Sequence, residues 1–232
     1  MARAGAGDRA VASRALAELC EIYWVPLYAW LRRAGRTHDD GLDLVQSFCA
    51  DLLERGGLLG ADAERGRFRA YLLGALRHFV ANEDRRERAQ KRGGDRVAWS
   101  LDAVDAVDEG IAANQRTPDE EFERRWAQAL LDRAASRLRD EYAARGRTDL
   151  VLALEPALLG DASAESQAAL AARLGTSEGA IKVALHRMRG RLRELIREEV
   201  LHTVDDPSRV DDEIRSLMTA FAGSALAARR AL

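Results

Sequence analysis

The sequence is poor in cysteine and proline, and it has no long run of apolar residues. Its two cysteines, Cys20 and Cys49, lie among apolar neighbours and form no CxxC pair. This setting favours two reduced thiols in a core over a disulfide or a metal site. No apolar run approaches the roughly 18 residues that span a bilayer, and the first residues lack the apolar segment of a secretory signal. We therefore expect a soluble, cytoplasmic protein without membrane insertion.

The sequence also lacks the signatures of catalysis. Its histidines follow no metal-ligand spacing, and it contains no glycine-rich phosphate loop or nucleophile motif. These histidines are His38, His78, His186 and His202. The glycines of GADAERGRF have no strand before them, so this stretch is interpreted as a turn. We expect no enzymatic activity, no cofactor and no metal.

Helix-forming residues dominate the composition. Ala, Leu, Arg and Glu are abundant, they lose little side-chain entropy in a helix, and runs of β-branched residues are short. With 4 prolines and 47% hydrophobic residues among 232, the chain can form helices and bury a core. The composition predicts an all-α fold, in one large domain or two small ones.

The formal net charge of −2 conceals four blocks of charge. Residues 65–96 carry a net charge of +6, and residues 97–123 carry −7. Residues 173–197 carry +5, and residues 198–213 carry −6. Because a solvated helix surface usually mixes its signs, these blocks indicate partners of opposite charge. Two basic blocks predict two contacts with a polyanion.

Apolar residues at steps of three and four predict amphipathic helices in the first half of the chain. The first helix covers residues 11–33. The second begins after Thr37, which can cap it, and presents an acidic outward side. The acidic side consists of Asp40, Asp43, Asp51 and Glu54. The opposite, buried stripe consists of Leu42, Val45, Phe48, Cys49, Leu52 and Leu53. A third helix over residues 67–92 is expected to bury Phe68, Tyr71, Leu72, Ala75, Leu76 and Phe79.

The second half begins with a linker and a new helix. Residues 96–116 have no sustained helical period and are strongly acidic, which indicates a linker. In TPDEEFERRW, Thr117, Pro118 and Glu120 match a capping box with proline at the first helical position. Further helices are predicted near residues 149–159 and in the tail, where the apolar residues are Val210, Ile214, Leu217 and Phe221.

The stretch AALAARLGTSEGAIKVALHRMRGRLRELI, residues 168–196, interrupts its apolar period at LGTSEG. A helix-turn-helix explains the interruption, because its tight turn favours a residue that tolerates positive φ, and Gly175 is such a residue. Ala171 is small where the two helices approach, and Ser177 can cap the second helix. The residues spaced for a shared core are Leu170, Leu174, Ile181 and Ala184. A plain helical hairpin is the alternative.

The second of these helices predicts a polar, basic outer face. With Ile181, Leu185 and Met188 inward, the outward stripe is Glu178, Lys182, His186, Arg189 and Arg193. Side chains near the start of this helix would meet base edges, and the arginines from Arg187 onward would meet phosphates. A solvated face without a partner is the alternative.

Three stretches in this order resemble the sigma-70 family of RNA polymerase sigma factors, of the extracytoplasmic-function type. They are DDGLDLVQSFCADLLER, RGRFRAYLLGALRHFVANEDRRERAQKR and LAARLGTSEGAIKVALHRMRGRLREL. The resemblance covers about residues 20–200. It implies a first domain that binds core RNA polymerase and opens the minus-ten promoter element, and a second that reads the minus-thirty-five element.

The resemblance assigns ranges and residues to these roles. It implies a region 2-like domain at 1–95, an acidic linker at 96–116, a region 4-like helix-turn-helix domain at 117–202 and an acidic tail at 203–232. The expected polymerase contacts are Asp40, Asp43, Gln46 and Ser47. The melted minus-ten strand would be held by Arg77, His78, Asn82, Arg85 and Arg86. Double-stranded promoter DNA would be held by Ser177, Glu178, Lys182, His186, Arg187 and Arg189.

Two features depart from the family pattern, and rival functions stay open. A long stretch, residues 142–166, precedes the helix-turn-helix, and the tail after Leu201 lies beyond the minimal pattern. The tail is expected to pack on its domain; the alternatives are that it covers the basic surface of residues 187–197 or binds a regulator, such as an anti-sigma protein. The rival functions are a helix-turn-helix transcription regulator that is not a polymerase subunit, and a helical protein that binds polymerase without recognising promoters.

Overall fold

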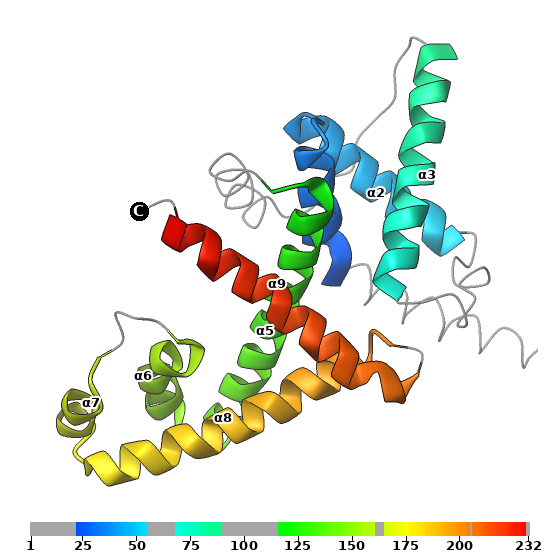
Figure 1. Cartoon of the computed structure of the whole chain (residues 1–232). Coiled ribbons are helices and arrows are strands. Elements are labelled where there is room, and N and C mark those ends of the chain that lie inside the picture. Colours follow the sequence, from blue (N-terminus) through cyan, green and yellow to red (C-terminus); the bar gives the residue numbers. More distant parts are fainter. Residues whose placement is uncertain (1–21, 55–67, 90–115, 161–164, 205, 231–232) are drawn as a thin grey trace, which may run out of the picture. The chain divides into compact units, whose positions relative to one another are not determined.

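The computed structural model describes residues 22–54, 68–89, 116–160, 165–204 and 206–230. Within these ranges every regular element is helical, which confirms the all-α prediction (Figure 1). None of the helices in the described ranges combines the length and apolar character needed to cross a membrane. Cys20, Trp99 and nearly all of the expected linker lie outside the described residues.

The chain divides into two compact units. The first unit comprises Met1–Ala129 and Thr203–Leu232, and the second comprises Leu130–His202. The division falls inside helix α5 (Pro118–Ala143). The tail is therefore grouped with the first unit, whereas the ranges expected from the sequence treated it as a separate segment.

The first unit is built around aromatic side chains. Its described elements are the helical segment 22–33, α2 (His38–Glu54), α3 (Phe68–Ala89), the start of α5, the 3₁₀ turn η2 (Pro207–Arg209) and α9 (Val210–Arg230). The ring of Tyr23 lies 5.6 Å from that of Phe68 and 6.3 Å from that of Phe122, so one residue joins three helices. Tyr23 is fully buried, and this burial raises the pKa of its hydroxyl.

Both predicted helix starts in this unit have the expected caps. The backbone N–H of Asp40 donates to the Thr37 hydroxyl at 3.2 Å, which caps α2. At α5 the N–H of Glu120 donates to the Thr117 hydroxyl at 3.3 Å, and the N–H of Thr117 donates to the Glu120 carboxylate at 2.8 Å. The capping box predicted at Thr117 is therefore confirmed.

The buried face of α3 differs from the predicted stripe. Leu72 and Leu76 are buried as expected, but the aromatic residues and Ala75 are only half-buried, while Leu73, Val80 and the charged Arg69 are buried. The half-buried residues are Phe68, Tyr71, Ala75 and Phe79. The buried face is broader than one stripe because α3 packs against more than one element: the ring of Phe79 lies 5.5 Å from that of Phe48 in α2, and Phe68 contacts Tyr23 of the helical segment 22–33.

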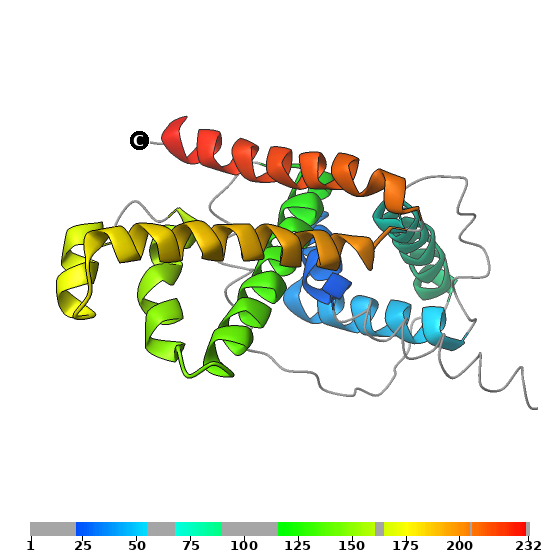
Figure 2. The ribbon, with the colours of Figure 1, turned by 90° about the horizontal axis from the view of Figure 1, so that it is seen from below.

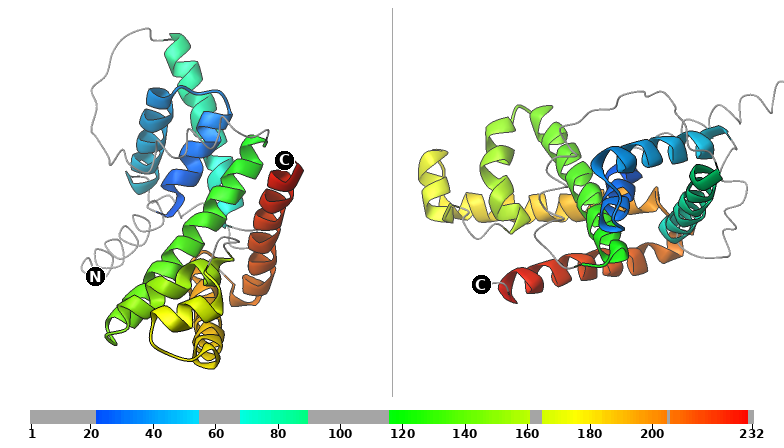
Figure 3. Two further views of the ribbon diagram at one scale, coloured as in Figure 1. Left: turned by 90° about the vertical axis from the view of Figure 1, so that its left-hand side faces the viewer. Right: turned by 90° about the horizontal axis from the view of Figure 1, so that it is seen from above.

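The second unit joins the end of α5 to three more helices. These are α6 (Thr148–Leu159), α7 (Gln167–Arg173) and α8 (Glu178–Leu201). Figures 2 and 3 show α7 at the start of α8 and α6 beside α8, which agrees with the packing of both helices against α8. One apolar cluster unites the unit, with Leu138, Leu154, Leu170, Ile181, Leu185 and Met188 among its buried residues.

Candidate nucleic-acid interface

The predicted interruption at Gly175 separates two helices. Gly175 has φ +62°, and the N–H of the next residue, Thr176, donates to the carbonyl of Ala171 at 2.9 Å, which closes a tight turn. The N–H of Ala180 donates to the Ser177 hydroxyl at 3.2 Å, so Ser177 caps α8. The turn and the cap predicted from the sequence are both confirmed.

The two helices share the predicted core. Leu170, Ala171 and Ile181 are buried, and Leu174 and Ala184 pack against them while half-buried. Farther along α8, Leu185 and Met188 continue the same buried face. This arrangement leaves the opposite face of α8 available to a ligand.

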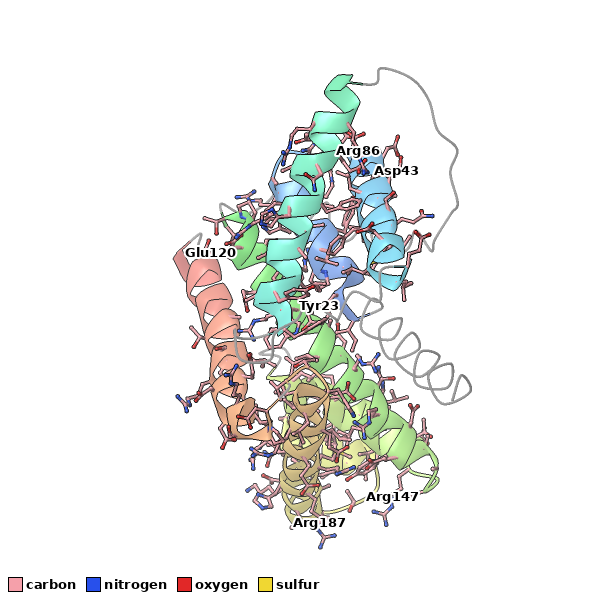
Figure 4. The ribbon with its side chains drawn as sticks, turned by 90° about the vertical axis from the view of Figure 1, so that its right-hand side faces the viewer. Tyr23, Asp43, Arg86, Glu120, Arg147 and Arg187 are labelled. Atoms are coloured by element: carbon pink, nitrogen blue, oxygen red, sulfur yellow. The ribbon has the colours of Figure 1, made fainter. Side chains whose placement is uncertain are left out.

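The exposed face of α8 carries the residues expected to read DNA. Glu178, Lys182, His186, Arg187, Arg189 and Arg193 are all exposed. The ammonium of Lys182 lies 3.6 Å from the Glu178 carboxylate, and Arg189 donates to the carbonyl of Ala157 at 3.3 Å. Figure 4 shows the Arg187 side chain extending away from the ribbon. Ser177 uses its hydroxyl oxygen as the cap, so it contributes to this face chiefly by fixing the start of α8.

The geometry of this turn gives a first testable expectation. Gly175→Ala should destabilise the second unit by about 1 kcal/mol, because an L side chain strains a positive φ. Gly190→Ala is the matched control: Gly190 lies inside α8 with nothing within 4 Å of an added Cβ, so it should stabilise by about 0.5–1 kcal/mol. Urea denaturation followed by circular dichroism measures the unfolding free energy of both variants. If both substitutions changed it equally and in the same direction, strain at the positive φ of Gly175 would not explain the result.

In the first unit, α3 exposes a second set of basic and polar residues. Arg77, His78, Asn82, Arg85 and Arg86 are all exposed. Arg85 donates to the carbonyl of Ala81 at 3.0 Å, and Arg86 pairs with Glu83 at 2.7 Å, both within the same helix. Arg77 differs, because it pairs with Asp119 of α5 at 2.5 Å and lies 5.7 Å from the ring centre of Trp30.

The predicted polymerase contacts lie on α2. Asp40, Asp43 and Ser47 are exposed, and Gln46 is half-buried. The Thr37 hydroxyl donates to the Asp40 carboxylate at 2.7 Å, so this carboxylate also serves the cap of α2. Figure 4 labels Asp43 on α2 and Arg86 on α3.

No known protein family, curated protein or solved structure matches this chain. Across the described ranges, no group of three or more histidine, cysteine, aspartate or glutamate side chains is placed to hold a metal ion. The features that bear on function are therefore the chain's own: two exposed basic faces, an acidic helix and the order of the three motifs.

Many charges in the blocks are paired within the chain. In the second unit, Arg191 pairs with Glu141 at 2.7 Å and with Glu198 at 3.2 Å, while Arg137 pairs with Glu199 at 2.9 Å. Hydrogen bonds from Arg191 hold the pKa of Glu141 below its ordinary value. Burial raises the pKa of Glu199, but hydrogen bonds from Arg133 and Arg137 outweigh it and the pKa is lowered. Arg191 of the basic block 173–197 and Glu198 and Glu199 of the acidic block 198–213 are therefore already paired within the unit, so the charge left for a partner is smaller than the sequence suggests.

Sequence reasoning missed a buried ion cluster on α3. Arg69 is 3% exposed, pairs with Glu213 of α9, which is 2% exposed, and pairs with Glu123 at 2.8 Å. Its guanidinium lies 4.2 Å from the ring centre of Trp126. The available signal was that Arg69 falls on the apolar stripe with Leu72 and Leu76, since a charge on such a stripe needs a buried partner.

Proposed function

We propose that this chain is a sigma factor of the sigma-70 family, of the extracytoplasmic-function type, which directs core RNA polymerase to promoters and assists promoter opening. The observation that carries the proposal is the helix-turn-helix of α7 and α8, with its turn at Gly175 and an exposed basic face at the start of α8. That face presents lysine and arginine, the side chains that bind guanine edges and phosphates in a major groove.

The first unit separates this proposal from its closest rival. A helix-turn-helix regulator that is not a polymerase subunit would use α7 and α8 equally well, and it has no need of an exposed acidic helix followed by an exposed basic one. In the proposed function, Asp40, Asp43, Gln46 and Ser47 on α2 dock on polymerase. The exposed arginines of α3 then bind phosphates of the separating minus-ten strand.

Substitutions on α8 and on α3 should affect different steps: α8 variants should change promoter selectivity, and α3 variants should change promoter opening. On α8, Lys182→Ala or His186→Ala is expected to lower selectivity for the minus-thirty-five sequence, because these side chains would contact base edges. On α3, Arg85→Ala or Arg86→Ala is expected to impair opening. An equal loss at every promoter sequence for Lys182→Ala would assign it to phosphate contact alone.

Run-off transcription tests the proposal directly. The intact chain is added to core polymerase with a library of genomic fragments, and the start sites are sequenced. The proposal expects start sites that share two spaced elements, a loss of them with Asp43→Arg, and little change with Asp140→Arg, an exposed charge reversal in the second unit. If core polymerase gains no start sites while the chain still binds particular DNA sequences, the result supports a helix-turn-helix regulator and contradicts the sigma-factor proposal.

A further inference from the structure

Two arginines of α3 form ion pairs with α5, and their burial is opposite. Arg69 pairs with Glu123 and is 3% exposed, whereas Arg77 pairs with Asp119 and is 48% exposed, with Asp119 itself 54% exposed. A buried charge cannot leave its partner without a large desolvation cost, but an exposed pair contributes little and exchanges partners easily. The Arg69 pair is therefore structural, and the Arg77 pair is exchangeable.

The Arg77 pair also involves one of the α3 residues proposed to bind DNA. Arg77 shares α3 with the exposed His78, Asn82, Arg85 and Arg86. Its partner comes from another helix, whereas Arg85 bonds to Ala81 and Arg86 pairs with Glu83 within α3. Both oxygens of the Asp119 carboxylate accept from Arg77 Nη2 at 2.5 Å. A phosphate group presents the same kind of acceptor to a guanidinium, with oxygens carrying negative charge.

Asp119 is held in place by its surroundings. It lies in the first turn of α5, next to Glu120 of the capping box, and Trp30 Nε1 also donates a hydrogen bond to its carboxylate at 2.9 Å. The hydrogen bond from Arg77 keeps the pKa of Asp119 below its ordinary value, so the carboxylate is charged. A negative group is thus held against Arg77 of α3 in the absence of DNA.

We propose that Asp119 is an internal competitor for DNA: its carboxylate occupies the place on Arg77 that a phosphate takes when α3 binds a nucleic-acid strand. This inference rests on the proposed function of α3. In the free protein the pair lowers the affinity for DNA, and binding exchanges Asp119 for phosphate. The contact thereby restricts binding by the first unit to strands that offer enough other contacts to displace Asp119.

The test measures binding of the full chain to a fluorescein-labelled single-stranded DNA of mixed sequence by fluorescence anisotropy. Asp119→Asn keeps an acceptor for Trp30 and removes the charge that competes for Arg77. It should tighten binding about two- to fivefold at low ionic strength, and the gain should shrink at high salt. In the Arg77→Ala background, Asp119→Asn should give no gain, since the competed residue is absent.

Asp212→Asn is the matched control. Asp212 is 57% exposed, pairs with Arg215 one turn away on α9 and belongs to the same unit, so its replacement changes the net charge equally. An equal gain from Asp212→Asn, or a gain from Asp119→Asn that persists without Arg77, overturns the inference. Unchanged affinity of Asp119→Asn overturns it too, with the proposed function intact. If the wild-type chain binds no DNA and directs no start sites with core polymerase, the proposed function fails as well.

Discussion

Arg69→Met should destabilise the first unit by about 3–5 kcal/mol. The Glu213 side chain is 2% exposed, and its carboxylate pairs with the Arg69 guanidinium. The substitution removes the guanidinium and leaves this carboxylate buried without that pairing. Removing one partner of a buried ion pair lowers the free energy of unfolding by this amount, because the other charge remains buried without compensation. The contact of the guanidinium with the Trp126 ring is lost as well.

Tryptophan fluorescence during urea denaturation measures this effect selectively. Of the four tryptophans, Trp24, Trp30 and Trp126 lie in the described part of the first unit, so their emission reports on its unfolding. The matched control is Arg77→Met on the same helix, which removes an exposed pair and should cost less than about 1 kcal/mol.

A second variant separates lost charge pairing from lost packing. Arg69→Met combined with Glu213→Leu replaces the buried pair by apolar side chains of similar volume, and such replacements are often neutral or stabilising. The double variant should therefore recover most of the stability lost in Arg69→Met. A double variant as unstable as Arg69→Met alone would show that the guanidinium acts through its shape or its contact with Trp126.

The same cluster bears on the acidic tail. Val210 and Leu217 of α9 are buried, and Glu213 between them pairs with Arg69 of α3. These contacts agree with the expectation that the tail packs on a folded domain. The domain in question is the first unit, to which Thr203–Leu232 belongs. Adjacent acidic residues of α9 are exposed, so the charge block of the tail combines a structural carboxylate with solvated ones.

Features encoded within one or two helical turns could be predicted from the sequence. The cap at Thr117, the turn at Gly175 and the inward side of Ile181 and Leu185 each depend on residues a few positions apart. Hydrogen-bonding side chains, positive φ and helical periodicity act locally, so a single sequence displays them.

Pairings between distant residues could not be predicted. Arg69 falls on an apolar stripe, which indicates a buried partner, but many carboxylates later in the chain could serve, and only folding selects Glu213. Arg77 was expected to face solvent and DNA; it is exposed, yet Asp119, 42 residues away, already holds it. The charge blocks suggested external partners because internal pairing depends on the tertiary fold.

Leu185→Ala should destabilise the second unit by about 2–5 kcal/mol. Leu185 is buried in the core that unites α7 with α8, so truncation removes apolar contacts and leaves a cavity beneath the proposed DNA-reading face. Amide hydrogen exchange should then be faster in α7 and α8, while the tryptophan fluorescence transition, which reports on the first unit, changes less. Binding to promoter DNA should fall at every sequence, because a smaller share of molecules presents a formed α8.

His186→Ala is the neighbouring control, and the comparison separates folding from recognition. His186 follows Leu185 directly but faces outward and is exposed, so its removal should change stability by less than about 0.5 kcal/mol. Its expected effect is on selectivity among minus-thirty-five sequences, at unchanged hydrogen exchange. If Leu185→Ala altered selectivity and left stability unchanged, the assignment of the inward and outward faces of α8 would be wrong, and with it the proposed recognition surface.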